Sequence, residues 1–567
     1  MKKNLTTLAL FTVVILALFL RGFNLGSLIS PYWEEVALGY DAYSIGQTGA
    51  DHHGTPWPLV AFESFGDWKP SGYFYFAAAS IKLFGLTVFS IRLPSMLAGL
   101  LIVVGMYFFS ELLLLRFASR MPKTQVALIQ LLSVFVTAVS SWLIMFSRAA
   151  WEVNLATAFL LWGIIFSLQF ARNRKCRFLL ISAVFFAVSV YTYHATRVIA
   201  PLIFLSILAS TFFENIWSVF KKGVLTHIQK LPKSEVLIGC FFLLLLLPLI
   251  ATLRSPEVSQ RFAETSIFSR LDIITESNAS IAAAGTPGAR VFFHRYVLFS
   301  REVLTNALSH FSLDFLFIHG DVNKRHSTGY MGILYFLDAV FISFGIYVLV
   351  RRYKLLGAFL LIWLVIGVLP ASISLATPHA LRIVPMAPLV LFIVAIGMSE
   401  GYLLLKNNMK TNLFRISVIS LASVYLLQVG AFWRYYTVIY PKESALEWQY
   451  GYQDVMTEVQ KYVEMDKKVA VSREYGRPAM YYFFMNSIDP RQVQAQDSTE
   501  VMDQSEFITY KNIVFFDTAD QVKDSDVIFA SPKSKVVTDI NDQRDMTQVY
   551  TLSSPTGIPL WIGYEKK

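Results

Sequence analysis

Residues 30–59 read SPYWEEVALGYDAYSIGQTGADHHGTPWPL and follow directly on an apolar segment at 5–21. The polar side chains at the mouth of that segment include Glu34, Glu35, Asp51, His52 and His53. A carboxylate beside a bilayer is costly unless it stays hydrated, pairs with a cation or binds a ligand. The stretch therefore predicts either solvated loop charges that anchor a helix end or a functional site at a membrane surface.

The composition of the whole chain favours a membrane protein. Of its 567 residues, 55% are hydrophobic and only 16% are charged, whereas a soluble protein carries about a quarter charged residues. The net charge is +10, but the basic residues stand in short clusters between apolar runs. This placement indicates orientation in a membrane rather than binding to nucleic acid.

Apolar segments long enough for a bilayer, which needs about 20 residues per helix, recur along the chain. We expect a polytopic α-helical membrane protein with about eleven transmembrane helices. The expected spans are 5–21, 94–115, 124–141, 154–171, 178–192, 198–213, 235–253, 330–350, 355–370, 382–405 and 413–431. The short apolar stretch 73–86 contains Lys82, so it is expected to lie in the interface as a surface helix.

Lys and Arg favour the cytoplasmic side of a membrane, and their positions set the expected orientation. The clusters are Lys2 and Lys3, Arg116 to Lys123, Arg172 to Arg177, Lys221 to Lys233, Arg351 to Lys354, and Lys406 with Lys410. All of them fall inside if the N-terminus is cytoplasmic, the C-terminus is outside and 73–86 does not cross. The first loop, 22–93, and the large loop, 254–329, then face outward.

The part of the chain after the last span has ordinary hydropathy. Strands are expected in KKVAVSREY, NIVFFDTAD and SDVIFASP, and part of a helix in RPAMYYFFMN. The sequence thus predicts a membrane domain at 1–435 and a small extracytoplasmic α/β domain at 436–567.

Several motifs carry a family resemblance. They are WEEVALGYDAYSIGQTGADHHG (33–54), GDWKPSGYFYFAAASIKLFGLTVFSIRLPSMLAGLL (66–101), SRAAWEVNLA (147–156), YTYHATRVIAPL (191–202), HFSLDFLFIHGDVNKRHSTGYMGILYFLDAVF (310–341) and TPHALRIVPMAP (377–388). Their order resembles glycosyltransferase-C (GT-C) enzymes, in particular the family of protein O-mannosyltransferases and lipid A aminoarabinose transferases. Each motif alone is weak, and the order and the outward placement together carry the resemblance.

The resemblance implies a membrane glycosyltransferase at the cell membrane with its active site on the outer face. The donor would be a polyprenyl-phosphate-linked sugar, and the acceptor a lipid, glycan or protein hydroxyl or amine. In that family the first acid of the pair is the general base, which here is Glu34. One displacement at the anomeric carbon would invert its configuration.

This chain has glutamate where the family usually has aspartate. The extra methylene of Glu34 moves the carboxylate by about one bond length, and an error near 1 Å can cost about a hundredfold in rate. Three explanations stay open: the backbone compensates, Glu35 is the base, or the chain is impaired.

Further polar residues at the outer helix ends are candidates for binding. Lys69, Arg382, His379, Tyr193 and Arg197 are candidates for the donor phosphate or sugar. Glu152, Arg148, Asp51 and His326 are candidates for holding the acceptor or supporting the base. Arg148 and Glu152 are four residues apart, so on one helix they would share a face and could simply pair.

Metal use stays open at this stage. His52 and His53 are weak candidates for a divalent ion, because adjacent histidines on a loop rarely suffice alone. The alternative to an enzyme is a transporter or a receptor-like protein without catalysis. A transporter would place ionisable residues near mid-membrane and often shows repeats, whereas here the charges gather at outer helix ends.

Overall fold

The computed structural model describes residues 2–64, 67–212, 233–252, 255, 265–496, 501–502, 506–536 and 546–567. Within them the chain forms two compact units. The first comprises Met1–Phe23 and Ser95–Trp433, and the second comprises Asn24–Pro94 and Arg434–Lys567. The predicted basic residues Lys221, Lys222 and Lys230, and positions 254 and 256–264 of the predicted outer loop, lie outside the described residues.

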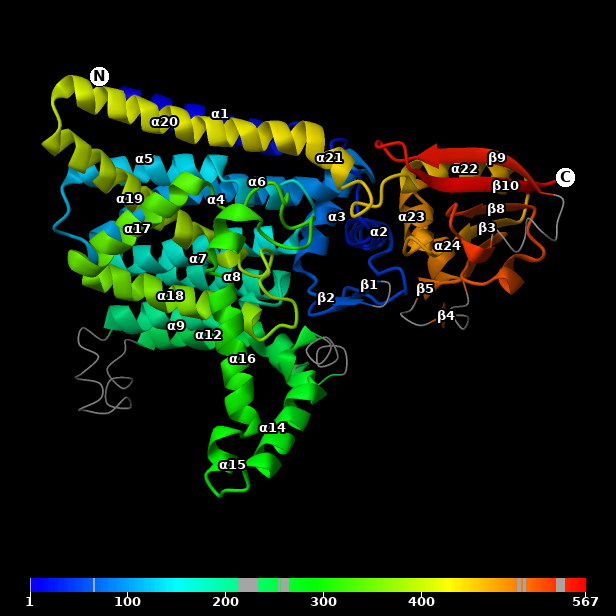
Figure 1. The fold of residues 1–567 in the computed structure, drawn as a ribbon, viewed down its shortest axis with the longest axis horizontal. Coiled ribbons are helices and arrows are strands. Elements are labelled where there is room, and N and C mark those ends of the chain that lie inside the picture. The colour runs from blue at the N-terminus through cyan, green and yellow to red at the C-terminus, as the bar shows by residue number, and fades with distance from the viewer. Residues whose placement is uncertain are drawn as a thin grey trace. The chain divides into compact units, whose positions relative to one another are not determined.

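The first unit is helical, and its long helices run alongside one another (Figure 1). Its elements are α1 (Lys2–Gly22), α4 (Val88–Phe117, which begins in the second unit), α5 (Lys123–Val139), α6 (Ser141–Phe146), α7 (Glu152–Asn173), α8 (Cys176–Thr192), α9 (Thr196–Phe212), α12 (Lys233–Ala251), η1 (Ile267–Ser269), α14 (Leu271–Ala284), α15 (Ala289–Phe292), α16 (Arg295–Ser309), η2 (Asp314–Ile318), α17 (Phe336–Arg351), α18 (Lys354–Ser372), η3 (Val384–Met386), α19 (Ala387–Asn408) and α20 (Thr411–Arg434).

Six helices among the described residues are long and apolar enough to cross a membrane: Val88–Phe117, Glu152–Asn173, Ser234–Ala251, Lys354–Ser372, Val384–Asn408 and Thr411–Glu443. Shorter apolar helices lie at Thr6–Gly22, Lys123–Val139, Cys176–Thr192 and Thr196–Thr211. A mostly helical membrane protein is thus confirmed. Each expected span overlaps a helix, while the number eleven and the orientation stay predictions.

Small and hydroxyl-bearing residues bring α7 and α8 close together. The Ser182 hydroxyl lies 2.7 Å from the Gly163 carbonyl oxygen and 2.6 Å from the Ser167 hydroxyl, and the Ser189 hydroxyl donates to the Ala156 carbonyl at 2.8 Å. Such side chains let helix backbones approach and bond across an apolar interface.

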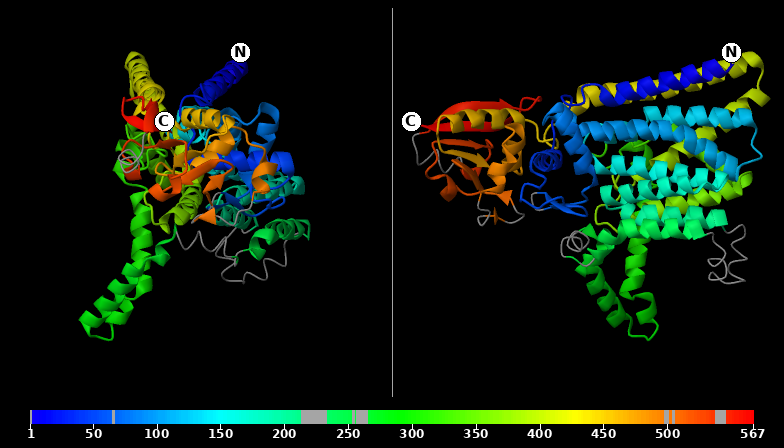
Figure 2. Two further views of the ribbon diagram at one scale, coloured as in Figure 1. Left: turned by 90° about the vertical axis from the view of Figure 1, so that its right-hand side faces the viewer. Right: turned by 180° about the vertical axis from the view of Figure 1, so that it is seen from behind.

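The helical segments between α12 and α17 differ from the rest of the first unit. Helices α14 and α16 pack as a pair around Ile273 and Phe299, and in both figures they project away from the long helices (Figure 2). The predicted large outer loop is therefore ordered into helices over its described part.

The second unit combines the first predicted loop with the C-terminal part of the chain. Its elements are α2 (Trp33–Thr48), β1 (Phe62–Ser64), β2 (Asp67–Lys69), α3 (Gly72–Phe84), η4 (Tyr435–Ile439), α21 (Tyr440–Glu443), α22 (Tyr452–Glu464), β3 (Val469–Ser472), α23 (Pro478–Met485), α24 (Pro490–Gln494), β4 (Val501–Met502), β5 (Glu506–Phe507), β6 (Thr509–Tyr510), β7 (Ile513–Phe516), η6 (Ala519–Val522), β8 (Val527–Ala530), β9 (Met546–Ser553) and β10 (Pro559–Lys566).

A mixed sheet in the order β6-β7-β3-β8-β10-β9 is the largest element of this unit. Strand β3 pairs in parallel with β7 and β8, and β10 pairs antiparallel with β8 and β9. The three strands and the helix expected from the sequence all form, as β3, β7, β8 and α23.

Helix α2 packs against α23 through a glycine. A Cβ atom on Gly39 would lie 2.6 Å from the Phe484 ring and 2.9 Å from Ile91. Tyr40 of α2 also donates its hydroxyl to the Ile488 carbonyl at 3.1 Å. These contacts explain why residues 24–94, expected to be an outer loop of the membrane part, group with residues 434–567.

Helices α17 and α19 approach each other so closely that only glycine fits at Gly397. A Cβ atom there would overlap the carbonyl oxygen of Phe341. We predict that Gly397→Ala lowers the free energy of unfolding by about 1–3 kcal/mol, measured as a lower midpoint of thermal unfolding in detergent. Gly401→Ala on the same helix meets no atom within 4 Å and should leave the midpoint unchanged. Equal midpoints for the two variants would contradict this packing.

Candidate functional site

Glu34 and Glu35 lie in the first turn of α2, where the helix dipole favours negative charge. Glu35 is fully buried. Its two oxygens accept hydrogen bonds from Arg92 Nε at 2.8 Å and Nη2 at 2.7 Å. This is a bidentate ion pair, the strongest geometry available to the two groups.

The remaining N–H groups of Arg92 bind backbone carbonyls of the segment that leads into α2. Nη1 donates to Leu25 and Ile29, both at 3.0 Å, and Nη2 donates to Ser30 at 3.2 Å. All five donors of the guanidinium are therefore used. Glu35 neutralises a buried cation that holds this segment in place, and this geometry argues against Glu35 as the catalytic base.

Glu34 differs from its neighbour in exposure and in partners. Its side chain is 32% exposed. Its Oε2 accepts a hydrogen bond from the Tyr32 hydroxyl at 3.2 Å and lies 3.9 Å from Lys69 Nζ. Glu34 therefore presents a carboxylate that an incoming molecule can reach, positioned by a phenol and an ammonium group.

Lys69 is almost completely buried at the end of β2, opposite Phe62 of β1. The β1–β2 hairpin thus fixes the position of the Lys69 ammonium group beside α2. Lys69 Nζ lies 5.5 Å from the centre of the Trp33 ring, and the Arg477 guanidinium lies 4.8 Å from the same ring. Two cations therefore flank the tryptophan that precedes Glu34, an arrangement suited to an anionic ligand.

His52 belongs to a buried hydrogen-bond network around Asp41. His52 Nδ1 lies 2.5 Å from Asp41 Oδ1, and the Ser64 hydroxyl donates to Asp41 Oδ2 at 2.7 Å. Burial by itself lowers the pKa of His52, but the Asp41 carboxylate outweighs it and the net shift is upward. The network holds the loop after α2 in place.

Asp51 and His53, on either side of His52, also belong to this folded turn. Asp51 Oδ1 accepts the backbone N–H groups of His53 and Thr55 at 3.0 and 2.8 Å, which closes a tight turn. Burial raises the pKa of Asp51. Burial, followed by the neighbouring charge of His52, lowers the pKa of His53 to about 4. The structure therefore brings Asp51, His52 and His53 together in one folded turn.

In the first unit, Arg148 lies in the turn between α6 and α7. Its Nη1 donates to the Leu20 and Arg21 carbonyls, both at 3.1 Å, and its Nη2 donates to the Phe23 carbonyl at 2.5 Å. Arg148 thereby satisfies orphan carbonyls at the end of α1. Arg148 and Glu152 do not share a helix, because α7 begins at Glu152.

The second group in this unit gathers around Asp321. His326 Nδ1 lies 3.3 Å and His379 Nδ1 lies 3.7 Å from Asp321 Oδ2. Burial, then the charges of His326 and Arg382, lower the pKa of His379. From the sequence, His379 is a candidate for the donor and His326 a candidate for the acceptor, and the fold brings the two side chains together.

Three further residues predicted from the sequence, Tyr193, Arg197 and Arg382, lie at or near the ends of helices. Tyr193 follows the last residue of α8, and Arg197 lies in the first turn of α9. Arg382 is mostly buried; burial lowers its pKa, while Tyr193 and Asp321 act in the opposite direction. Its Nη1 atom has no hydrogen-bond partner in the part of the chain that the structure describes. Arg382 thus presents a buried cation suited to an anionic group.

Several contributors were missed by sequence reasoning. Tyr32, Gln449 and Arg477 carry no motif signal, because two of them come from the C-terminal part of the chain and meet α2 only in the fold. Gln449 Oε1 accepts the Trp33 backbone N–H at 2.7 Å. His310 was also missed, because it acts through the backbone of His379, whose N–H it accepts at 3.1 Å.

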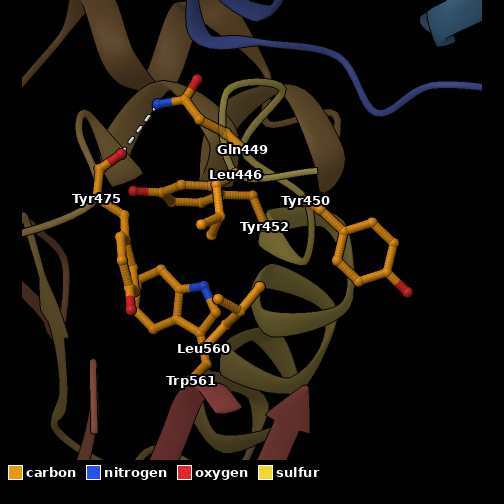
Figure 3. Close-up of a pocket in the computed structure, with 7 residues that line it drawn as sticks. All are labelled: Leu446, Gln449, Tyr450, Tyr452, Tyr475, Leu560 and Trp561. Atoms are coloured by element: carbon orange, nitrogen blue, oxygen red, sulfur yellow. Dashed lines mark hydrogen bonds between the residues drawn. The ribbon is translucent and has the colours of Figure 1, made fainter. Parts of the chain in front are cut away.

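A pocket in the second unit lies on the other side of Gln449 (Figure 3). It is lined by Leu446, Gln449, Tyr450, Tyr452, Tyr475, Leu560 and Trp561. Gln449 Nε2 donates to the Tyr475 carbonyl at 2.9 Å, the bond drawn in the figure. None of the residues predicted from the sequence lines this pocket, and Gln449 connects its wall to the start of α2 through the Trp33 backbone.

The fold of the whole chain is similar to that of solved structures. The chain is similar to ArnT from Cupriavidus metallidurans bound to undecaprenyl phosphate, with a TM-score of 0.55 and 12% identity over 99% of this chain and 98% of that chain. The apo state of the same protein gives a TM-score of 0.53 and 11% identity, with the same coverage.

The archaeal oligosaccharyltransferase AglB from Archaeoglobus fulgidus, in complex with an inhibitory peptide and a dolichol-phosphate, gives a weaker TM-score of 0.46. Its identity is 11% over 100% of this chain and 74% of that chain. No family model matches the chain, and neither does any curated protein. The resemblance predicted from the sequence is confirmed as a shared fold.

The different environments of the two glutamates predict different effects on stability. Glu35→Gln leaves the buried Arg92 charge uncompensated, so the free energy of unfolding should fall by about 3–5 kcal/mol. Glu34→Gln removes a partly exposed carboxylate and should change it by less than about 1 kcal/mol. The midpoint of thermal unfolding of the purified proteins in detergent measures both effects. Equal midpoints would show that the ion pair does not hold the start of α2.

Proposed function

We propose that this protein is a membrane glycosyltransferase that moves a sugar from a polyprenyl-phosphate carrier to an acceptor hydroxyl or amine, with Glu34 as the general base. The observation that carries the proposal is the asymmetry of the acidic pair. Glu35 is enclosed by Arg92, whereas Glu34 is partly exposed and lies beside Tyr32 and Lys69. The fold shared with ArnT bound to undecaprenyl phosphate supports the same class of donor.

The reaction is a single displacement. The acceptor oxygen or nitrogen attacks the anomeric carbon and forms the new bond as its proton passes to the Glu34 carboxylate. The bond between the anomeric carbon and the phosphate oxygen breaks, and the polyprenyl phosphate leaves with that electron pair. A base within hydrogen-bond reach of the acceptor proton contributes typically 10²–10⁴-fold to the rate. Attack opposite the leaving group inverts the anomeric configuration.

Lys69 is proposed to stabilise negative charge close to the Glu34 carboxylate. Its ammonium group is buried at the end of β2, 3.9 Å from Glu34 Oε2. A buried ammonium interacts more strongly with an anion than an exposed one does. In the first unit, the buried Nη1 atom of Arg382 lacks a hydrogen-bond partner among the described residues, and it suits an anionic group.

Glutamate at position 34 fits this role by compensation. The Tyr32 hydroxyl, two residues earlier, bonds the carboxylate and limits the additional freedom that the longer side chain brings. The roles of Tyr193, Arg197 and Glu152 in donor and acceptor binding rest on the family resemblance. We further propose the topology with a cytoplasmic N-terminus, eleven spans and the chemistry on the outer face, which is supported by the distribution of Lys and Arg.

Substitution of Glu34 tests the proposed base directly. Purified protein in proteoliposomes would receive radiolabelled undecaprenyl-phosphate sugars, one sugar at a time, with membrane extract as acceptor. Transfer by Glu34→Gln should fall by about 10²–10⁴-fold, while Glu34→Asp should retain part of the activity. Binding of undecaprenyl phosphate should be unchanged in Glu34→Gln, because the variant alters the base and not the fold.

Glu443→Gln is a matched control. Glu443 is an acid in the same unit that also accepts a tyrosine hydroxyl, from Tyr435 at 2.7 Å. This variant should transfer sugar at the wild-type rate. Wild-type transfer by Glu34→Gln would overturn the assignment of the base, and a wild-type protein that transfers no polyprenyl-linked sugar would overturn the proposed function.

A further inference from the structure

Asp321, His326 and His379 form a compact cluster that the proposed reaction does not use as a unit. Asp321 and His326 lie in the loop between η2 and α17, and His379 lies in the segment between α18 and η3. Among the described residues, this is the one group of three His, Cys, Asp or Glu side chains whose ligand atoms all lie within 4.8 Å of one another. Two separate loops of the first unit therefore meet at three metal-ligating side chains.

The spacing of these atoms suits a single small cation. His326 Nδ1 lies 3.3 Å and His379 Nδ1 lies 3.7 Å from Asp321 Oδ2. Around a tetrahedral Zn²⁺ ion with bonds of about 2.0–2.2 Å, neighbouring donor atoms lie roughly 3.3–3.6 Å apart. The two imidazoles thus already stand near the distances that one ion requires.

Two buried histidine nitrogens face the Asp321 carboxylate. His326 Nδ1 and His379 Nδ1 are both buried without a partner of suitable geometry among the described residues. Asp321 Oδ2 instead accepts the Ala380 backbone N–H at 2.7 Å, and Oδ1 accepts that of Asn323 at 2.9 Å. Unsatisfied buried polar atoms are costly and rare, and a cation bound between these two nitrogens and the carboxylate oxygen would satisfy all three atoms.

The surroundings hold the ligands in position as the outer partners of metal sites do. His310 Nδ1 bonds the Asn306 carbonyl at 2.7 Å and must donate its proton there, which leaves Nε2 to accept the His379 backbone N–H. The His326 ring lies against Trp151 and Phe146, with ring centres 5.3 and 6.2 Å away. The backbone of His379 and the ring of His326 are therefore both held by neighbouring residues.

We propose that Asp321, His326 and His379 bind one divalent cation of the zinc class through a carboxylate oxygen and two imidazole nitrogens. Two nitrogens and one oxygen suit Zn²⁺, whereas Mg²⁺ and Ca²⁺ prefer oxygen ligands throughout. Three protein ligands leave a fourth position open to water or an anion. The ion ties the loop after η2 to the segment before η3. The proposal does not depend on the proposed sugar transfer.

Metal content of the full-length purified protein tests the site. The protein in detergent would be loaded with Zn²⁺, desalted and analysed by elemental mass spectrometry. The wild type should retain about one Zn²⁺ per chain, and His326→Gln, His379→Gln and Asp321→Asn should bind at least about 10–100-fold more weakly. His319→Gln is the matched control, because His319 lies just before the same loop and pairs with Asp314 on the exposed surface. It should retain the ion.

Equal Zn²⁺ content in the wild type and the three ligand variants, or no Zn²⁺ in the wild type, would overturn the site. A second measurement uses the wild type alone, so it tests the site even if the variants fail to fold. Wild-type protein loaded with Co²⁺ should show the visible d–d absorption of a four-coordinate ion, and excess Zn²⁺ should abolish it. If the wild type shows no such absorption, the proposed coordination is wrong.

Discussion

The guanidinium of Arg92 is the group around which the start of α2 is organised. It is buried and donates five hydrogen bonds, two to Glu35 and three to the carbonyls of the segment that leads into the helix. A buried charge without these partners would cost several kcal/mol. The ion pair therefore fixes where α2 begins, and with it the position of the next carboxylate in the turn.

The ion pair between Arg92 and Glu35 gives the two adjacent glutamates, Glu34 and Glu35, different environments. Glu35 is held by Arg92, while Glu34, one residue earlier and about 100° around the helix, emerges beside Tyr32 and Lys69. The β1–β2 hairpin places Lys69, and Gln449 from the C-terminal part holds the backbone at Trp33. Residues far apart in the sequence thus converge on one turn of helix.

In the first unit, Asp321 draws two loops together in a similar way, with backbone N–H groups that fix the carboxylate.

The sequence predicted the mostly helical first unit, because apolar length is a local signal. It also located β3, β7, β8 and α23, where short apolar runs are bounded by polar residues. It did not predict that residues 24–94 pack with the C-terminal part, since this depends on a missing side chain at Gly39 and on aromatic contacts across more than 400 positions. The β9–β10 hairpin was missed because β9 is mostly exposed and lacks the apolar run of a buried strand. Arg148 shows a similar limit: its spacing to Glu152 suggested a shared helix, but the turn before α7 places it over the carbonyls of α1.

The most direct test of the central claim is an experimental structure of the protein with a polyprenyl-phosphate sugar and its acceptor bound. The account predicts the Glu34 carboxylate within about 2.6–3.2 Å of the acceptor hydroxyl or amine, with Glu35 still enclosed by Arg92. A structure in which Glu34 points away from the sugar, or in which Glu35 leaves Arg92 to meet the acceptor, would contradict it.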